Sequence, residues 1–174
     1  MKKILVMDRK NYDPSLKVLQ RVAVRGIIFI DGKLLLVETE FGELKLPGGG
    51  KEIGESDITT LIREVKEETG YQVIESSIRE FGEIEEKRLS THESMIWNQF
   101  SRLYFCDVSL NPSECEYTEN EKTYGFHQVL YSLDDAIAKN QALIDKEGEH
   151  GWNQREYNTL RLIKQYFFGG VLEE

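Results

Sequence analysis

Cysteines, prolines and long apolar runs are all scarce in this sequence. Two cysteines among 174 residues are too few for a disulfide framework. The longest apolar runs, Gly26–Ile30 and Leu34–Val37, are far shorter than the roughly 20 residues that a membrane-spanning helix needs. Asp8 interrupts the first apolar segment before a signal-peptide core could form. We therefore expect a soluble, cytoplasmic protein that does not associate with membranes.

Positive charge is scarce as well. The chain has 22 Lys and Arg against 31 Asp and Glu, which gives a formal net charge of −9. This surplus repels the phosphates of duplex nucleic acid, so we expect no such partner. Most of the surplus lies in two segments. Gly49–Gly70 has 3 basic and 6 acidic residues, and Asn111–Glu121 has no basic and 4 acidic residues.

The length and the 40% hydrophobic content predict a single domain spanning residues 1–174. The segments Arg21–Ile30 and Lys33–Glu38, joined by Asp31-Gly32, predict a β-hairpin. The other predicted strands are Tyr71–Ile74, Ile78–Lys87, Phe100–Val108 and Phe126–Tyr131, and the predicted helices are Ser56–Thr69, Leu133–Ile144 and Trp152–Phe168. This order predicts an α/β (α+β) fold with a central mixed β-sheet between helices.

The first predicted helix gathers three glutamates on one side. Four apolar residues have the spacing of a core-facing stripe: Ile58, Leu61, Ile62 and Val65. At 100° per residue, Glu64, Glu67 and Glu68 share one arc beside that stripe. Like charges at this spacing cost roughly 0.2–0.5 kcal/mol per pair, so a bound cation would account for them. Mg²⁺ is the default hard cation for carboxylates. A solvated acidic face, with Arg63 paired to Glu67, is the alternative.

The wider pattern around this helix resembles a known family. From Gly49 the sequence reads GGKEIGESDITTLIREVKEETGY, in which five residues separate Gly49 from Glu55 and seven separate Glu55 from the run Arg63–Tyr71. This segment, residues 49–71, matches the Nudix box of the Nudix (MutT-like) hydrolases, except that Tyr71 replaces the usual aliphatic residue. The likeness extends over roughly Val22–Ala138. It implies a Nudix-type α/β/α sandwich, with a strand extension at residues 1–20 and a C-terminal helix at residues 152–168.

The resemblance implies a pyrophosphohydrolase that uses Mg²⁺ or Mn²⁺ and a water molecule that attacks phosphorus. By position in the motif, Glu64, Glu67 and Glu68 would hold the metal ion together with the backbone carbonyl of Gly48. Glu55 would be a supporting or additional metal-linked carboxylate. Arg63 would orient Glu67, and Arg63, Glu67 and Glu68 would form the catalytic set.

The general base and the contacts with substrate are less defined by the motif. Some family members use a box glutamate as the base, and others use a glutamate from a downstream loop. In the acidic segment Ser113–Lys122 we favour Glu121 and then Glu119, and a solvated acidic surface is the alternative. Candidates for contact with substrate phosphates are Lys87, Arg88 and Arg102.

The box indicates a reaction class and leaves the substrate open. Family ADP-ribose hydrolases often carry a proline downstream of the box, and dinucleoside polyphosphate hydrolases often carry a tyrosine. This chain has no proline between Gly70 and Asn111 and no tyrosine between Tyr71 and Tyr104. We therefore expect a nucleoside triphosphate or modified nucleotide as substrate, and ADP-ribose or another nucleotide sugar is the second candidate.

Two further functions are compatible with the scaffold that the resemblance implies. One is a non-catalytic nucleotide sensor, which would generally lack box glutamates that this chain retains. The second is an isomerase with a reactive cysteine, for which Cys106 in a predicted strand is poor support. A homodimer is also compatible with the resemblance.

Overall fold

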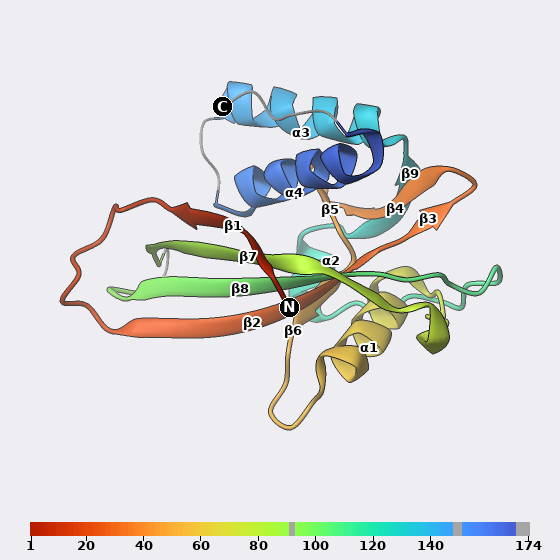
Figure 1. The fold of residues 1–174 in the computed structure, drawn as a ribbon, viewed down its shortest axis with the longest axis horizontal. Helices are drawn as coiled ribbons and strands as arrows, with labels where there is room; N and C mark the ends of the chain where they lie inside the picture. Colours follow the sequence, from red (N-terminus) through yellow and green to blue (C-terminus); the bar gives the residue numbers. More distant parts are fainter. Residues whose placement is uncertain (91–92, 148–150, 170–174) are drawn as a thin grey trace. The chain divides into compact units, whose positions relative to one another are not determined.

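The computed structural model describes residues 1–90, 93–147 and 151–169 (Figure 1). Its strands are β1 (Lys3–Asp8), β2 (Val18–Ile27), β3 (Phe29–Ile30), β4 (Lys33–Glu38), β5 (Leu44–Lys45), β6 (Gly48–Gly50), β7 (Arg79–Leu89), β8 (Ile96–Phe105) and β9 (His127–Tyr131). Its helices are α1 (Asp57–Thr69), the 3₁₀ turn η1 (Glu75–Ser77), α2 (Glu119–Thr123), α3 (Leu133–Glu147) and α4 (Gly151–Phe168). The chain forms two compact units, of which the first comprises Met1–Ile28 with Pro47–Glu116 and the second Phe29–Leu46 with Tyr117–Glu174.

The first unit contains a five-stranded mixed sheet in the order β1-β7-β8-β2-β6. The pairs β1–β7 and β2–β8 are parallel, and the pairs β7–β8 and β2–β6 are antiparallel. Strand β2 runs beside β8 along its full length, from Val18 opposite Ile96 to Ile27 opposite Phe105. The predicted fold class, mixed α+β with a mixed sheet, is therefore confirmed.

Helix α1 begins and ends where the sequence predicts. The Oγ of Ser56 accepts a hydrogen bond from the backbone N–H of Thr59 at 3.0 Å, which caps the N-terminus. Gly70 ends the helix in the left-handed conformation, with φ of 72°. A Cβ at Gly70 would also lie 2.0 Å from the carbonyl oxygen of Ser113, so only glycine fits at this point.

The buried face of α1 differs from the predicted apolar stripe. Leu61 and Val65 are fully buried, whereas Ile58 and Ile62 are only half-buried. The remainder of the buried face is polar and comprises Thr60, Glu64, Glu68 and Thr69. Figure 1 shows α1 beside β2 and β6, the strands that it contacts. The helix is thus rotated so that two of its glutamates face the sheet.

The glycine run before α1 forms strand β6. Gly49 pairs with Val24 of β2 in antiparallel register. Gly48 has φ of 139°, and a Cβ there would lie 2.1 Å from the carbonyl oxygen of Val24. The absence of side chains therefore allows β6 to approach β2 closely.

The second unit contains β4, which pairs with β3, β5 and β9. The β3–β4 hairpin turns at Asp31 and Gly32, both with positive φ, as the dipeptide predicts. Helices α3 and α4 lie side by side (Figure 1). Asn140 of α3 exchanges two hydrogen bonds with the backbone of Leu44, and the carboxylate of Glu156 of α4 accepts one from the N–H of Leu46.

Two predictions of secondary structure are wrong. Tyr71–Ile74 is not a strand, because only a single bridge forms there, between Val73 and Val108. The predicted strand Arg21–Ile30 is divided between β2 and β3, which belong to different units. In the described part of the chain, no helix combines the length and the apolar character needed to cross a membrane.

Candidate active site

The buried glutamates of α1 lie against the glycines of β6. Glu68 is 1% exposed, and its carboxylate accepts a hydrogen bond from the backbone N–H of Gly48 at 2.7 Å. Glu64 is 8% exposed and packs against Gly49, where an added Cβ would lie 2.3 Å from Oε2 of Glu64. The structure therefore explains why glycine precedes the helix: a side chain at residue 49 would displace the carboxylate.

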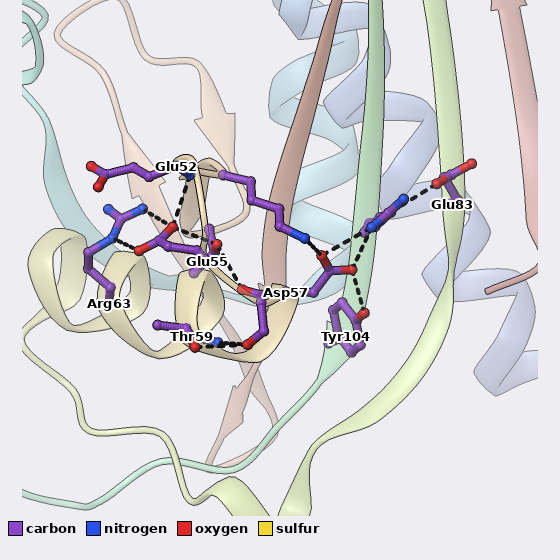
Figure 2. A network of polar contacts seen from close by, with 11 residues as sticks. Glu52, Glu55, Asp57, Thr59, Arg63, Glu83 and Tyr104 are labelled. Atoms are coloured by element: carbon purple, nitrogen blue, oxygen red, sulfur yellow. Dashed lines mark hydrogen bonds and ion pairs between the residues drawn. The ribbon is translucent and has the colours of Figure 1, made fainter.

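Arg63 brings three of the predicted carboxylates together. Its Nε and Nη2 donate to Glu55 at 2.8 and 3.0 Å, as Figure 2 shows. Its Nη1 donates to Glu64 at 2.8 Å and to Glu67 at 3.1 Å. Nη2 also donates to the carbonyl oxygen of Gly50 at 3.2 Å. Because every N–H of the guanidinium has a protein acceptor, the geometry favours an orienting role for Arg63 over contact with substrate.

Glu55 is bound on several sides. Besides Arg63, it accepts hydrogen bonds from the hydroxyl of Thr60 at 2.7 Å and from the backbone N–H of Glu52 at 3.0 Å. These hydrogen bonds, that of Arg63 foremost, lower the pKa of Glu55 to about 2. Glu55 thus connects the loop before α1 to Arg63. The group comprising Glu55, Arg63, Glu64, Glu67 and Glu68 is called the box cluster below.

The box cluster carries more negative than positive charge. Burial, together with the charge of Glu68, raises the pKa of Glu64 to about 7, and the hydrogen bond from Arg63 only partly opposes this. Four carboxylates of the cluster accompany a single guanidinium. An additional cation would therefore be favoured electrostatically at this point.

The donor atoms of the box cluster suit a hard divalent cation, but they are not arranged around a common point. Glu64, Glu67 and Glu68 supply carboxylate oxygens, the ligand type that Mg²⁺ prefers. Among the residues whose side chains the structure describes, 1–90, 93–144 and 152–169, no three His, Cys, Asp or Glu side chains converge in a way that could hold a metal ion. Arg63 and the Gly48 N–H take up the carboxylates instead, and the Gly48 carbonyl accepts from Nη1 of Arg25 at 3.2 Å. The ligand types present therefore suit the metal ion. On binding, the carboxylates and the Gly48 carbonyl would contact the metal in addition to, or in place of, these hydrogen-bond donors.

A second charged group meets the N-terminal turn of α1 (Figure 2). The carboxylate of Asp57 accepts hydrogen bonds from Nζ of Lys51 at 2.7 Å, from Nη1 of Arg102 at 2.9 Å and from the hydroxyl of Tyr104 at 3.0 Å. Arg102 also donates through Nε to Glu83 at 3.1 Å. Burial would raise the pKa of Asp57, but these hydrogen bonds outweigh it and lower the pKa. The group comprising Lys51, Asp57, Glu83, Arg102 and Tyr104 is called the Asp57 cluster.

The three candidates for phosphate contact lie in different surroundings. Arg102 joins the Asp57 cluster beside α1. The ammonium group of Lys87 lies 5.2 Å from the ring centroid of Tyr12. Arg88 lies 5.7 Å from the ring centroid of Trp97 and donates to the carbonyl of Leu89. Of the contacts that the structure defines for these three residues, only those of Arg102 reach α1.

The favoured downstream glutamates have structural partners. Glu121 forms a capping box at the start of α2, where its carboxylate accepts from the N–H of Thr118 at 2.8 Å. Glu119 pairs with Lys122 at 2.7 Å and is largely exposed. Both belong to the second unit. In the first unit, the backbone N–H of Glu116 donates to the carbonyl of Glu67 at 2.7 Å. A catalytic role for Glu121 stays a prediction.

Cys106 has the properties of a core residue. It is 4% exposed, and burial raises the pKa of its thiol to about 12. A thiol with such a pKa is a poor nucleophile at neutral pH. The hypothesis of an isomerase with a reactive Cys106 therefore gains no support from the structure.

Comparison with known proteins supports the family suggested by the motif. Residues 19–149 match the NUDIX domain. The "Putative 8-oxo-dGTP diphosphatase YtkD" of Bacillus subtilis (strain 168) is 31% identical over 129 residues, which are 70% of this chain and 77% of that protein. The "Putative ADP-ribose pyrophosphatase YjhB" of the same organism is 47% identical over 49 residues, 28% of this chain and 24% of that protein. The match to YjhB thus spans only about a quarter of that relative.

A solved structure shows the same fold. The NUDIX hydrolase from Nitrosomonas europaea superposes with a TM-score of 0.57, covers 87% of this chain and 90% of its own, and is 24% identical. Family members act on small nucleotide substrates and generally use divalent metal ions. The extent of the domain match, together with the aligned length of YtkD, establishes that this chain belongs to the Nudix hydrolase family.

Proposed function

We propose that this chain is a Mg²⁺-dependent pyrophosphohydrolase, with Mn²⁺ as a substitute metal, that converts a nucleoside triphosphate or modified nucleotide to the monophosphate and pyrophosphate. The observation that carries the proposal is the box cluster itself. One guanidinium organises a surplus of carboxylates at the charged positions of the Nudix box, which lie on α1 and, for Glu55, in the loop before it. A chain selected only for stability would not retain such a surplus of buried charge.

The residues of the box cluster divide into metal ligands and residues that orient them. Glu64, Glu67, Glu68 and the Gly48 carbonyl would hold the metal ion, which when bound neutralises phosphate oxygens and lowers the pKa of water. Arg63 keeps Glu64 and Glu67 oriented, and Glu55 keeps Arg63 in place. The oxygen of water forms a bond to phosphorus as the bridging P–O bond breaks and pyrophosphate leaves. The proton of that water passes to a box glutamate or to Glu121.

The relatives support the triphosphate class over the nucleotide sugars. The relative named for 8-oxo-dGTP hydrolysis aligns over 129 residues, whereas the one named for ADP-ribose aligns over 49. ADP-ribose or another nucleotide sugar is therefore the second candidate. A non-catalytic sensor is disfavoured, because this chain retains Glu55, Glu64, Glu67 and Glu68. A cytoplasmic location and a homodimer stay predictions.

A substrate panel tests the proposal. The full chain is assayed with Mg²⁺ and, separately, Mn²⁺ against dNTPs, NTPs, 8-oxo-dGTP, ADP-ribose, dinucleoside polyphosphates and capped RNA. We expect the highest kcat/KM for a triphosphate, with pyrophosphate and not orthophosphate released. A preference for ADP-ribose would move the substrate to the second candidate. No turnover of any compound with either metal would indicate the sensor.

The role of Glu121 is tested by comparing Glu121→Gln with Glu68→Gln. If Glu121 takes the proton, its variant loses on the order of 10²–10⁴ in kcat, as removal of a general base does. If Glu121→Gln has activity close to wild type and Glu68→Gln loses activity, the general base is a box glutamate and not Glu121.

A further inference from the structure

We propose that Asp57 is a positioning residue, which fixes the N-terminal turn of α1 and the preceding loop so that the box carboxylates are held where they bind the divalent cation. This inference rests on the proposed function, because it takes the box cluster to be the metal site. Nothing in the Nudix box pattern requires an acid at residue 57, and an acidic residue in the first turn of a helix is ordinary because it complements the helix dipole.

The contacts of Asp57 join three segments of the first unit. Asp57 is the first residue of α1, Lys51 lies in the loop between β6 and α1, and Arg102 and Tyr104 belong to β8. The carboxylate is 16% exposed and accepts from all three partners (Figure 2). Tyr104 is 6% exposed and so has little access to water as an alternative partner. The helix is thus attached to a central strand of the sheet at its first residue.

Two physical routes connect this attachment to the box cluster. The first runs through the loop, because Lys51 and Asp57 flank the segment that carries Glu55, and Glu55 holds Arg63, which in turn binds Glu64 and Glu67. Release of Lys51 would loosen this segment and thereby the orientation of the guanidinium. The loop route therefore acts on two of the candidate ligands at once.

The second route is the tilt of the helix. The far end of α1 stays fixed at Gly70, whose carbonyl accepts from the N–H of Ser113 at 2.8 Å. Glu64 lies six residues before Gly70, about 9 Å along the axis at 1.5 Å per residue. A tilt of about 5° around that end would move Glu64 by about 0.8 Å, which exceeds the roughly 0.5 Å within which ligand groups must be held. Loss of the attachment at Asp57 would therefore misplace the carboxylates without unfolding the helix.

The test measures binding of the metal alone. Mn²⁺ is titrated into the full chain, free of nucleotide, and free Mn²⁺ is followed by electron paramagnetic resonance. We expect the Kd of Asp57→Ala to rise on the order of tenfold, within the 10- to 100-fold range found when residues that support metal ligands are removed. Asp57→Asn, which retains one acceptor oxygen and loses the charge, should lie between wild type and Asp57→Ala.

Ser56→Ala is the matched control. It removes the N-cap hydrogen bond to Thr59 from the same turn of the same helix, and leaves every contact of Asp57 in place. It should lower the Tm to a similar extent as Asp57→Ala, but change the Kd less than twofold. Equal effects of the two variants on the Kd would reduce Asp57 to a general stabilising residue and overturn the proposal.

Two further outcomes keep the inference separate from the proposed function. An unchanged Kd in folded Asp57→Ala, with wild-type chain binding Mn²⁺, would overturn the positioning role alone. A wild-type chain that binds no Mn²⁺ would overturn the proposed function and this inference with it. If Asp57→Ala does not fold, Tyr104→Phe removes only one donor from the carboxylate. In that variant a rise in Kd of about two- to threefold supports the proposal, and no rise contradicts it.

Discussion

The box cluster and the Asp57 cluster both meet α1, and they differ in charge balance. The box cluster sets four carboxylates against one guanidinium, a formal balance of 1 − 4 = −3. The Asp57 cluster sets two carboxylates, Asp57 and Glu83, against Lys51 and Arg102, a balance of 2 − 2 = 0. Hydrogen bonds and ion pairs are dense in both clusters, so their number alone does not separate them.

Asp57 and Glu64, one carboxylate from each cluster, differ in pKa in the same sense. The pKa of Asp57 is lowered because its partners stabilise the charged form. The pKa of Glu64 is raised to about 7 because burial and Glu68 disfavour the charged form. A balanced cluster stabilises its own ions, whereas an unbalanced one favours a further cation or the protonation of a carboxylate. Local charge balance thus distinguishes the Asp57 cluster, which attaches α1 to the sheet, from the box cluster, which is the candidate metal site.

The largest effect is expected from Glu64→Gln. The amide keeps the shape that packs on Gly49 but removes a charged candidate ligand, so we expect kcat to fall on the order of 10³ with Mg²⁺. In EDTA the same variant should raise the Tm by roughly 2–4 °C, because relief of the repulsion with Glu68 is worth about 1 kcal/mol. Substrate assays and thermal unfolding measure the two effects.

Glu52→Gln is the control for that variant. Glu52 is exposed and lies in the same box, and it contacts the box cluster through its backbone: its N–H donates to the carboxylate of Glu55 and its carbonyl accepts from the N–H of Glu55. Its activity should stay within twofold of wild type. If the Glu64→Gln protein is active and its Tm is unchanged, the negative charge of Glu64 contributes neither to activity nor to repulsion within the box cluster.

The next largest effect is expected from Gly49→Ala. The added Cβ would lie 2.3 Å from the carboxylate of Glu64, which must then move. We expect Mn²⁺ binding to weaken on the order of 10- to 100-fold, as when a ligand's supporting contact is lost. Gly32→Ala is the control: φ of 77° makes alanine strained there, but no atom lies within 4 Å of the added Cβ, so it should lower stability and leave Mn²⁺ binding unchanged. Unchanged Mn²⁺ binding in Gly49→Ala would place the metal away from Glu64.

The parts of the fold that were predicted correctly depend on local signals. The limits of α1 follow from Ser56 and Gly70, and the β3–β4 hairpin follows from Asp31 and Gly32, all of which act within a few residues. The strand predicted around Val73 failed because a strand needs a neighbour along its length, and only Val108 pairs with it. Strand pairing depends on segments that are distant in the sequence, and the β-propensity of a segment carries no information about them.

The site shows the same limit. The box glutamates could be found because their spacing on one helix brings them together. Asp57 was missed because its partners on β8 are 45 and 47 residues away, and an acid in the first helical turn has an ordinary explanation in the helix dipole. The capping role of Glu121 was also missed, since the acidic segment contained several equivalent glutamates and α2 was not predicted.

In EDTA-treated protein, the contributions of Glu64 and Asp57 to stability should change with pH in opposite directions. The folded-state pKa of Glu64, about 7, lies above its ordinary value of 4.5, so its contribution to stability is present at low pH and is lost as the pH rises from about 4.5 to 7. The pKa of Asp57 lies below its ordinary value of 3.8, so its contribution is present at neutral pH and is lost as the pH falls below that value.

Urea unfolding at about pH 3–8 measures this difference. The free energy of unfolding of wild type minus that of Glu64→Gln should fall by roughly 1–3 kcal/mol between about pH 4.5 and 7. The corresponding difference for Asp57→Asn should be largest at neutral pH and shrink in acid. Parallel pH profiles for the two variants would contradict the opposite environments of the two carboxylates.

The smallest effect is expected from Glu83→Gln, which makes the same chemical change in the balanced cluster. Glu83 pairs with Arg102 at 3.1 Å, and its side chain is 15% exposed. Its loss should lower the free energy of unfolding by about 0.5–1 kcal/mol, as for other partly exposed ion pairs. Mn²⁺ affinity and kcat should stay within twofold, because Lys51, Arg102 and Tyr104 still bind Asp57. Neutralising Glu83 would then lower stability and leave activity unchanged, whereas neutralising Glu64 would raise stability and lower activity. A tenfold loss of activity in Glu83→Gln would mean that charge balance does not separate the two clusters, because Glu83 would then contribute to activity as the box glutamates do.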